Sequence, residues 1–266
     1  MKNEEMKINQ GNNNIEAIIF DWAGTTVDYG SFAPVQAFIE AFQEFGLYPT
    51  EEEVRKPMGM LKRDHIKTMM QMPRIRRMWQ ERYGKDWTEQ DVDAVYHKSE
   101  TSILEILKDF AEPKDYVLET IQELRNRGIK IGSTTGYTTQ MMNIVVPKAA
   151  ENGYAPDYWS SPSEVENHGR PYPYMIFRNM QALNISSVHR VIKVGDTVAD
   201  IKEGKNAGMR SVGIIEGSSV MGYSRESYEK LTEQEKEKAV ERATKTYLDA
   251  GADDVIQDIR GILQLL

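Results

Sequence analysis

The chain has 266 residues, enough for about two domains or for one large domain with an insertion. Its 41 acidic residues outnumber its 33 basic ones, and the net charge of −8 argues against nucleic acid or an anionic membrane as the main partner, because both bind a concentrated basic surface. Cysteine is absent, which excludes disulfides, thiolate nucleophiles and cysteine-ligated metals. None of the 4 histidines is spaced like the ligands of a zinc hydrolase.

The start of the chain is polar. Residues 1–14 hold no apolar segment of the kind that a secretory signal requires, so we expect a disordered leader there. Elsewhere no apolar stretch approaches the ~20 residues of a membrane-spanning helix. We therefore expect a cytoplasmic protein without a membrane partner.

Short apolar runs typical of buried β-strands occur at residues 15–20, 129–133, 191–194 and 211–215. Helical patterns occur at about 118–127, 139–152, 173–184, 199–207 and 225–250, and the last of these is charged and predicted to face solvent. This alternation predicts an α/β fold with a doubly wound parallel sheet, which is a Rossmann-like core. Ligands bind such sheets beyond the carboxyl ends of the strands, so the loops that begin at Asp21, Thr134 and Gly195 should converge on one crevice.

Residues 30–110 interrupt the alternation. An apolar stripe at helical spacing covers residues 32–45, and a long helix is expected at 88–109. Since no strand-like run occurs here, we predict an all-helical cap domain at 30–110, inserted into a core made of 15–29 and 111–266. A segment that emerges beside the first crevice loop is well placed to act as a lid, although a helical decoration without a chemical role fits the pattern too.

Carboxylates stand directly after two of the predicted strands. Asp21 follows the first strand and Asp196 the third, with Asp200 four residues further on. Either strand-end aspartate could be only a turn residue or a helix cap. Brought together at one crevice, they suit a hard cation with oxygen ligands, such as Mg²⁺.

Two further segments could bind an anion. Residues 134–136, Thr-Thr-Gly, offer hydroxyl and backbone N–H groups at a strand end, although such a pair of threonine and glycine is often only a turn. Arg170 precedes Pro171 and could hold a phosphate through two N–H groups. The recurrence of such signals at several strand ends predicts a phosphate site beside a metal.

Four segments resemble the motifs of the haloacid dehalogenase-like hydrolases. Residues 21–28, DWAGTTVD, resemble the signature D-x-D-G-T-x-x-D. Thr135-Gly136 resembles the second motif, and Arg170-Pro171 the third, where lysine is commoner. Residues 195–200, GDTVAD, resemble the acidic fourth motif. The motifs occur in the expected order, and the resemblance covers most of residues 15–215.

The resemblance implies a mechanism and a set of ligands. It implies that Asp21 attacks phosphorus and forms an aspartyl-phosphate. The implied ligands of Mg²⁺ are the carboxylates of Asp21 and Asp196 and the backbone carbonyl of Ala23. The groups implied to bind the phosphoryl group are Thr135, Gly136 and Arg170, with Asp200 and Thr25 in supporting positions.

Position 23 departs from the superfamily pattern. In its phosphatases and mutases a second aspartate occupies that position and protonates the leaving alkoxide, and Ala23 has no proton to give. General acid catalysis contributes about 10²–10⁴-fold, so an ordinary Mg²⁺-dependent phosphatase is the weaker alternative. A pseudoenzyme that binds phosphorylated metabolites is a second alternative.

One family within the superfamily accounts for this departure. The segments FDWAGTTVD, RKPMGMLKRDH, KIGSTTGYT, GRPYP and IKVGDTVADIKEG are similar to those of the phosphonoacetaldehyde hydrolases. The resemblance implies cleavage of the carbon–phosphorus bond of a small phosphonate, phosphonoacetaldehyde, to acetaldehyde and phosphate, a step of 2-aminoethylphosphonate degradation. It also implies a homodimer.

The same resemblance identifies Lys62 as the amine that forms a Schiff base with the substrate aldehyde. Nucleophilic catalysis by lysine makes an acid at position 23 unnecessary. Its neighbours Met58 and Ile66 are apolar, and partial burial could lower the amine pKa from ~10.4 toward ~7–8. His65 could shuttle protons or could be a packing residue, and Met58 and Tyr137 are predicted to line the site.

Overall fold

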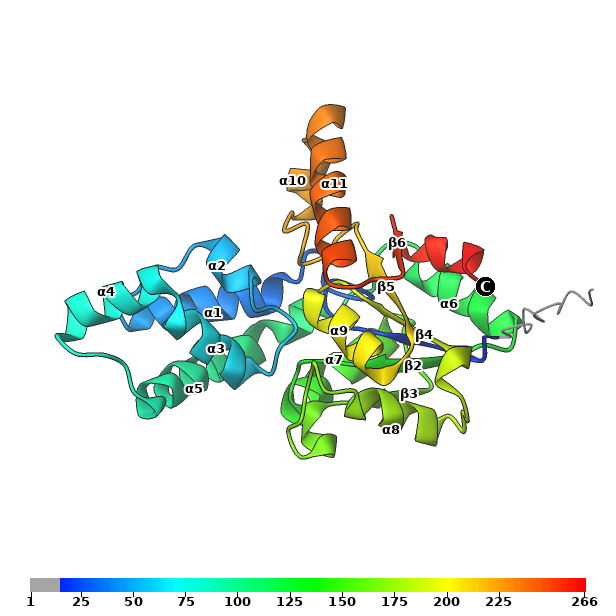
Figure 1. Ribbon diagram of the computed structural model, residues 1–266, viewed down its shortest axis with the longest axis horizontal. Helices are drawn as coiled ribbons and strands as arrows, with labels where there is room; N and C mark the ends of the chain where they lie inside the picture. The colour runs from blue at the N-terminus through cyan, green and yellow to red at the C-terminus, as the bar shows by residue number, and fades with distance from the viewer. Residues whose placement is uncertain (1–14) are drawn as a thin grey trace, which may run out of the picture.

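A computed structural model describes residues 15–266 (Figure 1). The leader expected at residues 1–14 lies outside the described residues. The centre of the molecule is a 6-stranded parallel sheet with the strand order β3-β2-β1-β4-β5-β6. Its strands are β1 (Ala17–Phe20), β2 (Lys130–Thr134), β3 (Tyr158–Ser160), β4 (Val191–Gly195), β5 (Arg210–Ile214) and β6 (Asp254–Ile256).

The strands predicted from apolar runs are confirmed as β1, β2, β4 and β5. The sequence did not reveal β3 and β6. Both are 3 residues long and lie at the two edges of the sheet, and most of their side chains are only partly buried. Because such edge strands need few apolar residues, neither leaves a detectable run in the sequence.

Every α-helix among residues 15–266 lies between two strands along the chain. These helices are α1 (Phe32–Glu44), α2 (Glu51–Arg55), α3 (Lys62–Gln71), α4 (Pro73–Tyr83), α5 (Glu89–Ile106), α6 (Val117–Asn126), α7 (Thr139–Glu151), α8 (Tyr174–Ala182), α9 (Val198–Ala207), α10 (Arg225–Glu229) and α11 (Glu233–Asp249). Short 3₁₀-helices occupy Leu107–Phe110, Pro162–Val165, Val188–Arg190 and Ile259–Gln264. No helix in this described part of the chain is long and apolar enough to span a membrane.

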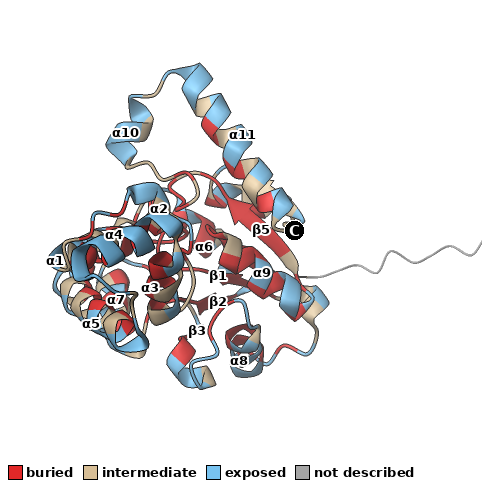
Figure 2. Ribbon diagram, turned by 60° about the vertical axis from the view of Figure 1, so that its left-hand side comes forward, coloured by how far each residue is buried: buried red, intermediate tan, exposed pale blue. Residues whose placement is uncertain are grey.

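Helices cover both faces of the sheet, which confirms the doubly wound α/β fold. Successive residues of a strand point to opposite faces. Ile18 and Phe20 of β1 share a buried cluster with residues of α6 and α7, whereas Ala17 and Ile19 pack with residues of α8 on the other face. Figure 2 shows how burial concentrates on the strands and on the helix sides that face them.

The strand order reverses at β1. β2 and β3 continue the sheet on one side of β1, and β4, β5 and β6 continue it on the other. Such a switch point leaves a crevice beyond the carboxyl ends of the two central strands, where doubly wound proteins bind ligands. The register pairs Phe20 with Val194, so the loops that follow β1 and β4 leave the sheet side by side.

Helices α1–α5 stand to one side of the sheet (Figure 1). They have a buried apolar cluster of their own, distinct from the one between β1, α6 and α7. Val35, Phe38 and Phe42 of α1 belong to this cluster, so internal packing accounts for the apolar stripe at 32–45. The limits of 30–110 for a separate cap domain stay a prediction.

The prediction of a single helix at 225–250 is wrong. The segment forms α10 and α11, because Thr232 begins a new helix with a capping box. The backbone N–H of Thr232 donates to a carboxylate oxygen of Glu235 at 2.8 Å, and the Glu235 N–H donates to the Thr232 hydroxyl at 3.3 Å. α11 is also not wholly solvent-facing, since Ala243 and Tyr247 are fully buried.

The Thr232 cap can be tested by substitution. Thr232→Ala removes the hydroxyl that satisfies a helix N-terminal N–H and should lower the free energy of unfolding by about 1 kcal/mol. Thr246→Ala is the matched control, because the Thr246 hydroxyl only bonds the carbonyl of Arg242 within the same helix. Urea unfolding measures both, and equal losses in the two variants would contradict the assignment.

Candidate active site

A cavity of about 20 Å³ lies at the switch point, between the sheet and the helices α1–α3. The sheet side supplies Asp21 after β1, residues 135–137 after β2 and Arg170. The helical side supplies Met58 and Lys62. The complete lining is Asp21, Ala23, Ser31, Pro34, Met58, Gly59, Lys62, Thr135, Gly136, Tyr137, Arg170 and Thr197. Most of the predicted site residues therefore lie around one cavity, which has room for about one water molecule.

Asp21 is fixed from two directions. Its backbone N–H donates to the carbonyl of Val194 at 3.0 Å, which extends the pairing of β1 with β4 by one residue. Its carboxylate accepts a hydrogen bond from Arg170 Nη2 at 2.6 Å. Both side chains are almost fully buried, and a buried charge of this kind needs such a partner. The Asp21 carboxylate is thus held at the edge of the sheet.

Three buried carboxylates meet beside the cavity. Ligand oxygens of Asp21, Asp196 and Asp200 all lie within 4.8 Å of one another. Burial, followed by the charges of Asp21 and Asp200, raises the pKa of Asp196 well above its usual value. Asp196 accepts hydrogen bonds from the Ser219 N–H at 2.8 Å and the Thr25 hydroxyl at 3.3 Å. This all-oxygen set suits a hard divalent cation, which would relieve the repulsion between the carboxylates.

The loop after β1 fits a metal site as well. Gly24 has a φ of 82°, which glycine adopts readily and other residues avoid. A Cβ at this position would collide with the carboxylate of Asp196. Only glycine therefore lets the backbone that carries the Ala23 carbonyl approach Asp196 so closely, as the ligand set implied by the motifs requires.

Asp200 is held differently from the other two aspartates. It accepts hydrogen bonds from Lys193 Nζ at 2.8 Å and from the Thr197 hydroxyl at 2.5 Å, and it pairs with Arg170 at 3.1 Å. Arg170 also pairs with Glu203 at 3.0 Å. Asp200 thus orients basic side chains, in keeping with a supporting position.

The sequence did not reveal the parts played by Lys193 and Glu203. Both are fully buried, and Lys193 lies in the middle of the apolar strand β4. A lysine in such a run signals a buried ion pair, because an unpaired charge would be costly to desolvate. Its partners could not be chosen from the sequence, since Asp200 and Glu203 reach it only after α9 packs on the sheet.

Thr135 and Gly136 lie in the loop after β2, which packs against the helical segment formed by α1–α5 and the loops between them. The Thr135 hydroxyl accepts a hydrogen bond from the Tyr137 N–H at 3.0 Å. A Cβ on Gly136 would lie 3.1 Å from the Met60 carbonyl oxygen and 3.2 Å from that of Gly59. Close backbone packing at this point brings the loop that precedes α3, and with it Lys62, to the sheet. Binding of a phosphoryl group by Thr135, Gly136 and Arg170 stays a prediction.

Lys62 is the first residue of α3 and is 4% exposed. Its Nζ lies 4.8 Å from the ring centroid of Tyr137 and 5.5 Å from that of Phe38. Burial lowers the pKa of its amine from 10.5 to about 8, although the charge of Asp21 acts in the opposite direction. A lysine nucleophile requires this lowered pKa.

His65 lies three residues after Lys62 on α3 and is not part of the cavity lining. It is fully buried, its Nε2 lies 2.8 Å from the carbonyl oxygen of Val54, and its ring centroid lies 4.2 Å from that of Phe38. Burial, followed by the charge of Lys62, lowers its pKa well below the usual value, so the imidazole is neutral at pH 7. A proton-shuttle role for His65 stays a prediction.

Comparison with known proteins identifies the class. Residues 15–208 match the family model of the haloacid dehalogenase-like hydrolases. Phosphonoacetaldehyde hydrolase of Lysinibacillus sphaericus is 48% identical over 248 residues, which are 93% of this chain and 92% of that protein. The bifunctional phosphonoacetaldehyde hydrolase/aminoethylphosphonate transaminase of Clostridioides difficile is 48% identical over 252 residues, or 95% of this chain, which spans 40% of that protein.

A solved structure agrees with these relatives. The phosphonoacetaldehyde hydrolase-like protein of Oleispira antarctica superposes with a TM-score of 0.92 and 34% sequence identity, covering 95% of this chain and 91% of that one. The chain, with its Rossmann-like sheet and carboxylate crevice, belongs to the haloacid dehalogenase-like hydrolase family. Within that family it belongs to the phosphonoacetaldehyde hydrolases.

Contact between the helical segment and the core can be tested at Gly59. Its φ is 86°, and a Cβ there would collide with the Thr197 hydroxyl of the core. Gly59→Ala should therefore displace Lys62 and lower kcat/KM by about 10²-fold, measured as phosphate release from phosphonoacetaldehyde, the substrate for which the relatives are named.

Gly84→Ala is the matched control for this substitution. Gly84 has a φ of 68° and also lies in the helical segment, but beyond its immediate chain neighbours nothing lies within 4 Å of the point that a Cβ would occupy. Both variants should lose about 1–2 kcal/mol of stability from left-handed backbone strain, but only Gly59→Ala should lose activity. Equal activities in the two variants would contradict the proposal that close contact at Gly59 positions Lys62.

Proposed function

We propose that the chain hydrolyses the carbon–phosphorus bond of phosphonoacetaldehyde to acetaldehyde and phosphate, as a step of 2-aminoethylphosphonate degradation. One observation carries the proposal. Lys62 of the helical segment and Asp21 of the core line the same cavity, while position 23 has an alanine. An amine and a carboxylate nucleophile without a general acid suit this substrate better than a phosphate ester.

Lys62 acts first in the proposed mechanism. Its neutral Nζ adds to the aldehyde carbon to give a carbinolamine, which takes up one proton and loses water, so that a protonated imine remains on the lysine. The lowered pKa of Lys62 supports this role. The aromatic rings of Tyr137 and Phe38 beside Nζ favour the cationic imine through their π faces.

Asp21 acts second. A carboxylate oxygen of Asp21 attacks phosphorus, the carbon–phosphorus bond breaks, and its electron pair passes to the imine, which becomes an enamine. The leaving group therefore needs no proton as the bond breaks, in keeping with Ala23. Water then hydrolyses the aspartyl-phosphate, while protonation of the enamine at carbon and hydrolysis of the resulting imine release acetaldehyde and restore Lys62.

We propose that the carboxylates of Asp21 and Asp196 and the carbonyl of Ala23 hold Mg²⁺. When bound, the ion supplies positive charge that offsets the repulsion between the Asp21 carboxylate and the anionic phosphonate. Arg170 contributes a second positive charge, because its Nη2 donates to the Asp21 carboxylate at 2.6 Å. Its guanidinium also orients Asp21 for attack.

We further propose that residues 30–110 act as a cap that opens and closes over the core. The cavity of about 20 Å³ is smaller than a phosphonate with two carbons, so substrate must be admitted by separation of the two sides. Closure excludes water from the imine and from the aspartyl-phosphate until cleavage has occurred. We also propose a homodimer in the cytoplasm, which sedimentation and cell fractionation would test.

Substitution of Lys62 tests the proposed function. Lys62→Arg keeps the positive charge but cannot form an imine, and phosphate release from phosphonoacetaldehyde should fall by about 10⁴-fold or more. Lys67→Arg is the control on the same helix. Lys67 is partly exposed, pairs with Glu89 and does not line the cavity. Substantial turnover by the Lys62 variant would rule out the Schiff base.

The pH dependence of imine formation follows from the pKa of about 8 for Lys62. The protonated amine does not react, so the rate should rise about tenfold per pH unit up to pH 8 and then level off. Reductive ethylation by acetaldehyde measures this when cyanoborohydride is in enough excess for imine formation to limit the rate, because acetaldehyde has no ionisable group. A rate at Lys62 that still rises tenfold per unit above pH 9, as an ordinary lysine would, contradicts the assignment.

A further inference from the structure

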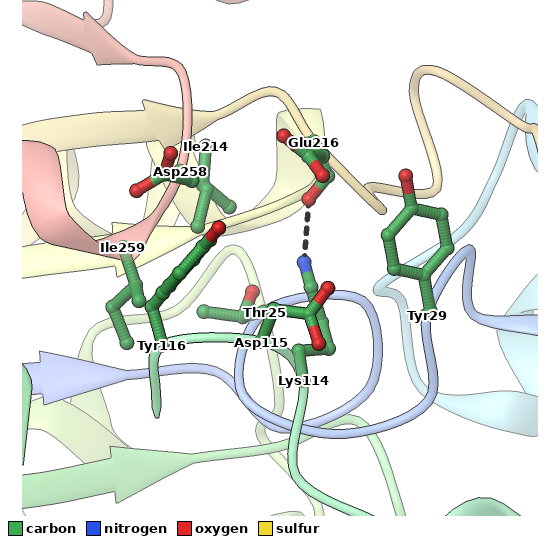
Figure 3. Close-up of a pocket in the computed structure, with 9 residues that line it drawn as sticks. All are labelled: Thr25, Tyr29, Lys114, Asp115, Tyr116, Ile214, Glu216, Asp258 and Ile259. Carbon is green, nitrogen blue, oxygen red and sulfur yellow. Dashed lines mark hydrogen bonds between the residues drawn. The ribbon is translucent and has the colours of Figure 1, made fainter. Parts of the chain in front are cut away.

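A further buried lysine, Lys114, lies beside the proposed metal site. Lys114 is 8% exposed and lines a cavity of about 10 Å³ with Thr25, Tyr29 and Glu216, among other residues (Figure 3). Its Nζ donates hydrogen bonds to the carbonyl of Gly24 at 2.5 Å and to that of Glu216 at 2.6 Å. Figure 3 shows the Lys114 amine directed at the Glu216 carbonyl across the cavity.

Both carbonyls belong to loops that touch Asp196. Gly24 follows Ala23 and packs so closely on the Asp196 carboxylate that no Cβ fits between them. Glu216 lies in the loop after β5, in which the Ser219 N–H donates to Asp196 Oδ2 at 2.8 Å. The amine of Lys114 thus bridges the two backbone segments that enclose one carboxylate.

The backbone of Lys114 adds a third tie. Its N–H donates to the carbonyl of Thr26 at 2.9 Å, in the same loop as Gly24. Main chain and side chain of one residue therefore fix the turn that presents the Ala23 carbonyl. None of these contacts involves Lys62, Arg170 or the cavity between core and helical segment, so Lys114 acts on the metal side only.

We propose that Lys114 is a positioning residue for Mg²⁺, which holds the Ala23 carbonyl and the Asp196 carboxylate in the arrangement that the ion requires. This inference rests on the metal site in the proposed function. It adds to that site the residue that fixes the geometry of the metal ligands. Groups that orient metal ligands affect affinity by about 10–100-fold.

Loss of the Lys114 charge and loss of its hydrogen bonds would change the affinity for Mg²⁺ in opposite directions. A lysine cation close to a metal site repels the ion, so removal of its charge alone would tighten Mg²⁺ binding. Loss of the two hydrogen bonds frees both loops and weakens binding. A positioning role therefore requires that the neutral variant bind Mg²⁺ more weakly, despite the electrostatic gain.

The test is calorimetric titration of the full chain, freed of metal, with MgCl₂. Lys114→Met should raise the Kd for Mg²⁺ about tenfold or more, and Lys114→Arg, which keeps the donors, should recover part of the loss. Lys130→Met is the matched control: Lys130 Nζ also donates to a carbonyl, that of Leu183 at 2.6 Å, but it starts β2 at the end of the sheet remote from the site.

An unchanged or lower Kd in Lys114→Met, or an equal rise in Lys130→Met, would overturn the inference. If Lys114→Met lacks the wild-type circular dichroism spectrum, Lys114→Gln decides by the same criterion, because it is also neutral and retains one donor group. Wild-type protein that binds no Mg²⁺ would refute the proposed metal site itself. Normal wild-type binding with no effect at Lys114 would refute only the positioning role.

Discussion

The parallel pairing of β1 with β4 brings two carboxylates into one buried crevice. The neighbouring side chains offset the negative charge that results. Asp21 and Asp196 follow the neighbouring strands β1 and β4 at the same end of the sheet, so their carboxylates lie close together. Arg170 neutralises Asp21 directly, and Lys193 holds Asp200 behind it. The remaining negative charge suits a divalent cation, and without a cation burial and mutual repulsion raise the pKa of Asp196.

A second feature of the site is that its two proposed nucleophiles, Asp21 and Lys62, come from different parts of the chain. Nearby carboxylates raise the pKa of a lysine, whereas burial lowers it. Lys62 begins helix α3 and faces aromatic rings, and burial outweighs the pull of Asp21, so its amine pKa falls to about 8. Gly59 and Gly136 allow the two backbones to approach closely enough for both groups to share one cavity.

The sequence predicted what local patterns and motifs encode. Apolar runs located the four longer strands of the sheet, and the motifs located the side chains around the cavity, Lys62 among them through family resemblance alone. The edge strands β3 and β6 escaped because three partly exposed residues leave no pattern. Glu203 and Lys114 escaped for another reason: each acts on the site through contacts with segments far away in the chain, which periodicity cannot reveal.

In the proposed mechanism an imine on Lys62 precedes attack by Asp21. The most direct measurement is the mass of the borohydride-reduced adduct on Lys62 in Asp21→Asn, incubated with Mg²⁺ and phosphonoacetaldehyde. The mechanism predicts a phosphonoethyl group on Lys62 in this variant, since the imine forms but the carbon–phosphorus bond stays intact, and an ethyl group in the wild-type protein. No adduct on Lys62 in either protein would contradict the mechanism.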